Sequence, residues 1–325
     1  MRRTDAAGKP LPPKPRRRVR AVSPLPMRQG VSASWVSLPP GPWATFEDFF
    51  AERFPLVARE DWRTRMSLGE VVDSDGGPVD PLAGYRPHLR LWYYRALEWE
   101  NEIPFEETVL FRDEHLLVAD KPHFLPVVPT GRYLQHSLLV RLKRRLGIET
   151  LSPVHRIDRG TAGLVVFSIE AHTRDRYQTL FRDRTVRKSY EAIVPWHEGA
   201  SLPPMRRSHL MDDASFLRTR EAPGEPNSET HIELVEVRGS HARLRLSPVT
   251  GRKHQLRVHC QALGLPIVND PFYPTLQPAG NDDFDRPLQL LARSLSFVDP
   301  LNGALRTFES PRRLALPSAP AAAAA

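Results

Sequence analysis

The sequence contains one cysteine, Cys260, and no long apolar run. One thiol in 325 residues cannot form an internal disulfide or a cysteine-rich zinc cluster. No apolar stretch approaches the roughly 18–20 residues that cross a bilayer, and the first residues lack the apolar core of a signal peptide. We therefore expect a soluble, cytoplasmic protein that does not enter a membrane, with Cys260 as a core thiol.

Two further absences concern cofactors. The chain has no alternation of strands and helices with a glycine-rich phosphate loop, which argues against a nucleotide-binding doubly wound fold. His254 and His259 are five residues apart, not the four that bring two zinc ligands together on a helix. The sequence therefore gives no signal for a nucleotide cofactor or a metal ion.

Acidic residues are scarce at the start of the chain. Residues 1–28 hold nine lysines and arginines but one acid, Asp5, and the remaining residues hold 37 of each sign. Nine prolines precede Trp43. We expect residues 1–42 to be a disordered tail that either holds nucleic acid loosely or aids solubility. A polyanion site in the folded part would have to come from local clustering of charge.

Apolar periodicity divides the rest of the chain into two parts. Residues 43–103 predict a small module with helices over 45–54 and 59–68 and short strands, one of them at 93–95. Residues 104–311 predict a larger α+β region, and residues 312–325 a disordered Pro/Ala tail. The expected strands are 108–112, 115–120, 164–169, 188–195, 230–237, 242–248 and 289–297, and the expected helices are 135–146, 171–183 and 251–263.

A charged cluster stands directly before a buried strand. His155, Arg156, Asp158 and Arg159 lead through two glycines into the apolar run Leu164–Ile169. Charged side chains beside a core strand are costly to desolvate unless they are paired or used. From the residues alone, Asp158 is either part of a structural ion pair or a catalytic carboxylate.

Three stretches resemble the RluA-type pseudouridine synthases. His155–Leu164 resembles the family's H-R-x-D-x-x-T-S/A-G-L, Val186–Ala192 its V-x-K-x-Y-x-A, and Thr250–His259 its T-G-R-x-H-Q-I/L-R-x-H. The stretch from Gly264 to Asp270 is similar to G-H-P-I-x-G-D, with Leu265 and Asn269 in place of histidine and glycine. The three main motifs occur in family order, and the resemblance spans roughly residues 106–311.

The resemblance implies a fold and an activity. The fold would be the α+β pseudouridine synthase fold, a mixed, mainly antiparallel sheet flanked by helices. The activity would be isomerisation of uridine to pseudouridine in structured RNA, either tRNA or rRNA. Because isomerisation consumes no redox equivalent and no external nucleophile, no cofactor is required. We expect a monomer.

The resemblance also implies roles for single residues. Asp158 would act at the anomeric carbon of the sugar, as a nucleophile or as the initiator of an elimination. Tyr190 would stack on the extracted uracil, Arg257 would pair with Asp158, and Arg156 would fill the space left by the flipped nucleotide. Further candidate RNA contacts are His155, Arg252 and His254.

Simpler interpretations remain for the same residues. A tyrosine in an alternating strand usually packs, and a helix arginine is usually solvated. The chain as a whole could be a catalytically silent RNA-binding protein, or a glycosidase that uses Asp158 and a second carboxyl group, for which Glu170 is the nearest candidate in sequence. The module at 43–103 loosely resembles the alpha-L RNA-binding module, but acidic residues occupy its first helix.

Overall fold

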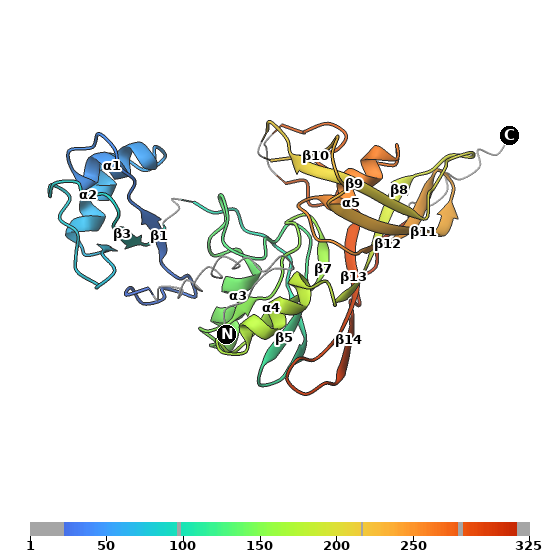
Figure 1. Ribbon diagram of the computed structural model, residues 1–325, viewed down its shortest axis with the longest axis horizontal. Coiled ribbons are helices and arrows are strands. Elements are labelled where there is room, and N and C mark those ends of the chain that lie inside the picture. Colours follow the sequence, from blue (N-terminus) through green and yellow to red (C-terminus); the bar gives the residue numbers. More distant parts are fainter. Residues whose placement is uncertain (1–22, 96–98, 216, 279–281, 317–325) are drawn as a thin grey trace, which may run out of the picture. The chain divides into compact units, whose positions relative to one another are not determined.

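The computed structural model describes residues 23–95, 99–215, 217–278 and 282–316. The chain divides into two compact units (Figure 1). The first comprises residues up to 96 except Gln29–Val31, and the second comprises Gln29–Val31 and the rest. Within the described ranges, no helix has the length and apolar character needed to span a bilayer.

The first unit is a three-stranded antiparallel sheet with two helices. Its elements are β1 (Ser34–Ser37), α1 (Phe46–Arg53), α2 (Arg59–Ser67), β2 (Val71–Val72) and β3 (Arg90–Tyr93), with strand order β1-β3-β2. Thr45 caps α1 in a capping box with Asp48. Phe50 and Trp62 pack with ring centroids 4.6 Å apart in the core between the helices and the sheet. Both predicted helices are confirmed, and the predicted strand lies slightly earlier, at β3.

The predicted boundaries of the disordered tail and of the small module were wrong. Residues 34–37 form β1, because alternate residues of this strand are half-buried and all four pair with β3. The second unit begins before residue 103, since Ile103 is buried in its core. At the other end Leu314 and Leu316 are buried, so residues 312–316 are not a free tail. Residues 1–22 and 317–325 lie outside the described residues.

The second unit is built on a mixed sheet. Its strand order is β10-β9-β11-β12-β8-β13-β7-β5-β4, with β14 beside β13 and β6 beside β7. The strands are β4 (Thr108–Arg112), β5 (Leu116–Lys121), β6 (Ser152–Pro153), β7 (Ala162–Ser168), β8 (Arg187–Pro195), β9 (Met205–Asp212), β10 (Thr219–Ala222), β11 (Ser228–Arg238), β12 (His241–Pro248), β13 (Leu290–Val298) and β14 (Leu305–Glu309). Among the described strands, only β7 and β13 pair in parallel. The predicted α+β class and mainly antiparallel sheet are confirmed.

The sheet forks where β7 and β13 meet. These strands pair only at Ala162 with Leu291 and at Gly163 with Ala292, and then diverge toward β6 and β14. Gly163 has φ +106°, and a Cβ there would lie 2.3 Å from the carbonyl oxygen of Ala292. Only glycine permits this approach of the two backbones.

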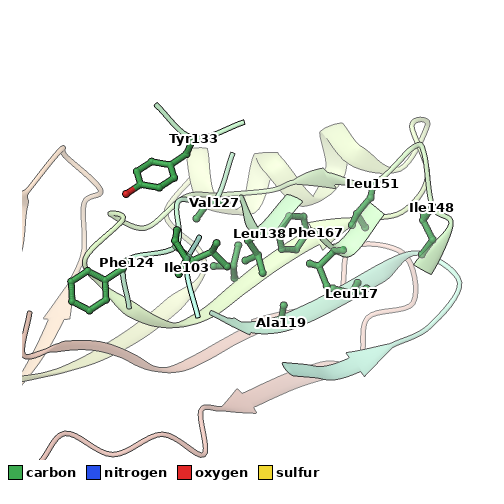
Figure 2. Packing of buried hydrophobic residues seen from close by; sticks show 13 residues of the cluster. Ile103, Leu117, Ala119, Phe124, Val127, Tyr133, Leu138, Ile148, Leu151 and Phe167 are labelled. Carbon is green, nitrogen blue, oxygen red and sulfur yellow. The ribbon is translucent and has the colours of Figure 1, made fainter. Parts of the chain in front are cut away.

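Two helices cover opposite faces of β5 and β7. Helix α3 (Leu138–Leu146) packs on Leu117 and Phe167, and Leu138 points toward that face in Figure 2. Helix α4 (Arg174–Arg182) buries Tyr177 against the alternate residues of the same strands. Helix α3 ends at Gly147, which has the left-handed φ of +66°.

The basic face of α3 is bound to the protein itself. Arg141 and Arg145 reach the buried Glu107 at 3.5 and 3.1 Å. Arg141 also donates to the carbonyl oxygens of Ile103 and Phe105. These two arginines therefore fasten the entry segment of the second unit to α3.

Helix α5 (Gln255–Ala262) covers the other half of the sheet. Leu256 and Cys260 pack against Leu244 and Leu246 of β12, so the expected core thiol is confirmed. The helix begins at Gln255 rather than at the predicted residue 251. His254 before it has φ +55°, which ends the helical path in that direction.

Candidate active site

A cleft of about 940 Å³ opens in the second unit beside loop 154–161, β8 and α5. Its described lining contains eight lysine and arginine side chains but one carboxylate, Asp158. The cations are Arg156, Arg159, Arg182, Arg184, Lys188, Arg252, Lys253 and Arg257. The cleft is therefore suited to a polyanion whose reacting part meets a single carboxylate.

The loop that carries Asp158 is fixed from both sides. Thr161 donates its backbone N–H to the carbonyl oxygen of Asp158 at 3.1 Å and enters β7 directly afterwards. The buried Lys121, at the end of β5, donates from Nζ to the carbonyl oxygens of Pro122 at 2.9 Å and Arg159 at 3.1 Å. The backbone around Asp158 is thus held against the central strands.

Arg257 lies between two carboxylates. Its Nη1 donates to Asp158 Oδ2 at 3.1 Å, while Nε and Nη2 donate to Asp270 at 2.8 and 2.6 Å. Burial by itself lowers the pKa of Arg257, but the hydrogen bonds to Asp270 and the charge of Asp158 raise it further than burial lowers it. The bidentate pair with Asp270 fixes the guanidinium so that Nη1 is directed at Asp158.

Tyr190 lies on β8 beside the same carboxylate. Burial raises the pKa of its hydroxyl, and the negative charge of Asp158 raises it further. Its ring packs partly on the core cluster of β8, β12 and α5, and the residue lines the cleft. Within the described residues its hydroxyl has no hydrogen-bond partner. The ring is supported on the core and its polar end is available to a ligand.

His254 also approaches Asp158, with Nε2 3.9 Å from Oδ2. Its Nδ1 lies 3.1 Å from the hydroxyl of Tyr273, which itself donates to the carbonyl oxygen of Thr219. Nδ1 therefore carries the proton, and Nε2 faces the cleft as an acceptor. Burial lowers the pKa of His254 to about 4, so the ring is neutral near pH 7.

Thr250, Gln255 and His259 of the third motif make structural contacts. Gln255 accepts from the hydroxyl of Thr250 at 2.7 Å and donates to the carbonyl oxygen of Glu229 and the hydroxyl of Thr230. His259 contacts that hydroxyl through Nδ1 at 2.9 Å. These contacts tie α5 to β11 and so set the position of Arg257.

The other predicted contacts differ in exposure. His155 accepts from the backbone N–H of Val166 at 3.1 Å and stacks on Phe181 with centroids 4.4 Å apart. Burial lowers the pKa of His155 to about 3, and the ring supports the loop. Arg156 and Arg252 are exposed at the cleft, and Arg252 donates from Nε to the carbonyl oxygen of Asn227 at 3.2 Å.

Sequence reasoning gave no role to two residues that hold the site. Asp270 ends the stretch Gly264–Asp270, but its pairing with Arg257 depends on a contact between residues 13 positions apart. Lys121 stands directly after the expected strand 115–120 and before Pro122. Both residues are charged and stand beside apolar segments, and this pattern could have indicated a buried charge that needs a partner.

Glu170 is not part of the cleft. Its Oε2 lies 2.6 Å from Nδ1 of His115, and it does not line the cleft near Asp158. Asn269, which stands where the related motif has glycine, has φ +60°, and asparagine tolerates this left-handed conformation. The described residues contain no group of three or more His, Cys, Asp or Glu side chains that could hold a metal ion.

Comparison with known proteins identifies relatives of this chain. Residues 115–262 match the family model of RNA pseudouridylate synthase. An uncharacterised RNA pseudouridine synthase of Synechocystis sp. is 30% identical over 232 residues, which are 70% of this chain and 78% of that protein. The dual-specificity RNA pseudouridine synthase RluA of Escherichia coli K12 is 34% identical over 226 residues, covering 65% of this chain and 97% of RluA. The structure of human RNA pseudouridylate synthase domain containing 1 has the same fold, with a TM-score of 0.53 and 22% identity over 66% of this chain and 86% of that one.

Proposed function

Because this chain belongs to the RluA-type family of RNA pseudouridine synthases, we propose that it isomerises a uridine of tRNA or rRNA with Asp158 as the catalytic carboxylate. One observation carries this proposal. Asp158 is the only carboxylate among the described residues that line a cleft with eight cationic side chains. A polyanion bound there would meet a single acidic group, which Arg257 and the loop hold in place.

The geometry supports a division of roles around Asp158. Arg257 fixes the carboxylate, and Asp270 in turn fixes Arg257. Tyr190 offers a ring at the cleft against which an extracted uracil can stack, and its free hydroxyl can exchange a proton with the base. Arg156, exposed at the rim, is available to occupy the space that the flipped nucleotide leaves.

A glycosidase would need a second carboxyl group at the reacting sugar. Among the described residues, the cleft offers none. Asp270 is linked to Asp158 through Arg257, but its carboxylate already accepts hydrogen bonds from Arg257 and from two backbone N–H groups. The arrangement therefore favours isomerisation over hydrolysis of the glycosidic bond.

Replacing Asp158 by asparagine tests the proposal. Asp158→Asn should lower turnover by at least about 100-fold, the usual effect of removing an essential covalent or acid–base group. RNA affinity should stay within a few-fold, because phosphate contacts dominate binding. The substrates would be unmodified tRNA and rRNA transcripts, with pseudouridine measured by nucleoside mass spectrometry after chemical labelling.

Three outcomes decide between the interpretations. Pseudouridine formed by the wild type and lost in Asp158→Asn supports the proposal. Release of free uracil would indicate hydrolysis, and RNA binding without any product would indicate a silent RNA-binding protein. Turnover above about 1% in Asp158→Asn would show that another group performs the chemistry.

A further inference from the structure

The residue that follows the C-cap of helix α4 has an unfavourable backbone conformation. Arg184 has φ +59°, and its N–H donates to the carbonyl oxygen of Phe181 while that of Thr185 donates to Leu180, at 3.3 and 3.0 Å. This is the Schellman pattern, in which the left-handed position normally holds glycine. An arginine there is conformationally strained, because its Cβ crowds the backbone. The strain lies at the edge of the cleft.

No contact with a described residue accounts for an arginine at position 184. It is exposed, lines the cleft and makes no hydrogen bond or ion pair with any described residue. A cation near a helix C-terminus is favourable, but Arg182 in the last turn of α4 already supplies one. Strained residues that persist are concentrated at functional sites.

A second cation faces the same part of the cleft. Lys188 lines the same cleft as Arg184. Burial lowers the pKa of Lys188, and the positive charge of Arg184 lowers it further. Lys188 Nζ donates to the carbonyl oxygen of Thr250 at 3.3 Å, and no described carboxylate pairs with it. Arg184 and Lys188 therefore present two positive charges to the cleft, and no described carboxylate pairs with either of them.

We propose that Arg184 and Lys188 form a subsite for a backbone phosphate of the RNA, next to the nucleotide that enters the site of Asp158. The inference rests on the proposed function for the identity of its ligand. A phosphodiester offers the single negative charge and the oxygen acceptors that two adjacent cations need. Binding there would explain why α4 keeps a strained arginine where glycine is favoured.

Arg184→Gly tests the subsite without disturbing the fold, because glycine is the preferred residue at this position. The matched control is Arg187→Ala, which removes one charge from an exposed residue three positions later that does not line the cleft. The probe is a fluorescein-labelled stem-loop RNA with uridines in its loop, titrated with the full chain at several salt concentrations. Arg184→Lys serves as the conservative variant.

Loss of one phosphate contact has a defined signature. The slope of log affinity against log salt should become shallower by about 0.7–0.9, and affinity at 0.1 M salt should fall about fivefold or more. Arg184→Lys should recover most of the affinity, and KM should rise more than kcat falls in Arg184→Gly. Arg187→Ala should keep the wild-type slope and activity, and Arg184→Gly should melt no lower than wild type.

Failure of the subsite differs from failure of the proposed function. If wild type forms pseudouridine but Arg184→Gly keeps the wild-type affinity and slope, the subsite is refuted and the function stands. If affinity falls with an unchanged slope, Arg184 contacts a base and not a phosphate, which also refutes the subsite. A shallower slope in an enzyme that forms no pseudouridine would support the subsite and contradict the function.

Discussion

Replacing Asp270 by asparagine should test how the candidate site is held together. The side chains of Arg257 and Asp270 are 4% and 0% exposed. Asp270 Oδ2 accepts from Nε of Arg257, and Oδ1 accepts from Nη2 and from the backbone N–H groups of Phe272 and Tyr273. An asparagine amide must place its NH₂ group against one of these sets of donors. Arg257 therefore loses both a charge and a hydrogen-bond acceptor.

Breaking a buried ion pair on one side typically costs about 3–5 kcal/mol. In a unit of about 150–250 residues each kcal/mol corresponds to about 2–4 °C, so the melting temperature of the second unit should fall by about 6–20 °C. Asp183→Asn is the control, because Asp183 and its partner Arg182 are 58% and 63% exposed. Exposed pairs contribute only about 0–1 kcal/mol.

Differential scanning calorimetry is the assay, since the two units should melt in separate transitions. Asp270→Asn should shift the transition of the second unit and leave that of the first unchanged. Adding Arg257→Met removes the facing donors and should restore part of the loss. A shift no larger than that of Asp183→Asn would refute the reasoning that this pair is a buried, essential contact.

Three other perturbations follow from the structure. Gly163→Ala should destabilise the second unit by about 2–6 kcal/mol, because a strained φ and an overpacked contact each cost roughly 1–3 kcal/mol, and a melting temperature near that of wild type would contradict this. Tyr190→Phe should keep RNA affinity and lose rate, whereas Tyr190→Ala should lose both affinity and rate. Binding and turnover assays measure the two quantities, and equal behaviour of the two variants would identify a packing residue. Burial lowers the pKa of His123, His254 and His259 to about 4 from an ordinary value of 6.5, so the unfolded chain takes up protons first as pH falls. The melting temperature of the second unit should hold above about pH 7 and fall between pH 6.5 and 4, and a constant value from pH 7 to 5 would exclude this linkage.

The sequence predicts best those parts whose signal is local. The run at 164–169 is apolar and short, and most of it lies in the fully buried strand β7 (Ala162–Ser168). The motif around Asp158 and the motif around Arg257 were expected to meet, and a 3.1 Å hydrogen bond joins the two residues. The first expectation rests on the local apolar run, and the second was implied by the resemblance of the two motifs to the family's.

Long-range contacts account for most of what the sequence did not predict. Strand β9 (Met205–Asp212) has few apolar residues, and pairing with β10 and β11 forms it. Strand β1 lies in a proline-rich stretch and depends on β3. The start of α5 is set by the hydrogen bond from Thr250 to Gln255, together with the left-handed His254, and neither follows from helical periodicity.

The position of β13 at the fork of the sheet affects how the enzyme is made. Residue 162 pairs with residue 291, so strands β7 and β8, which flank β13, leave the ribosome well before the strand that joins them. Asp158, Tyr190 and Arg257 would all emerge before β13 fills its position between β7 and β8. Domains form from the N-terminus as synthesis proceeds, and distant pairings form late. A nascent chain would therefore carry every proposed catalytic group and still be unable to modify RNA until β13 has emerged.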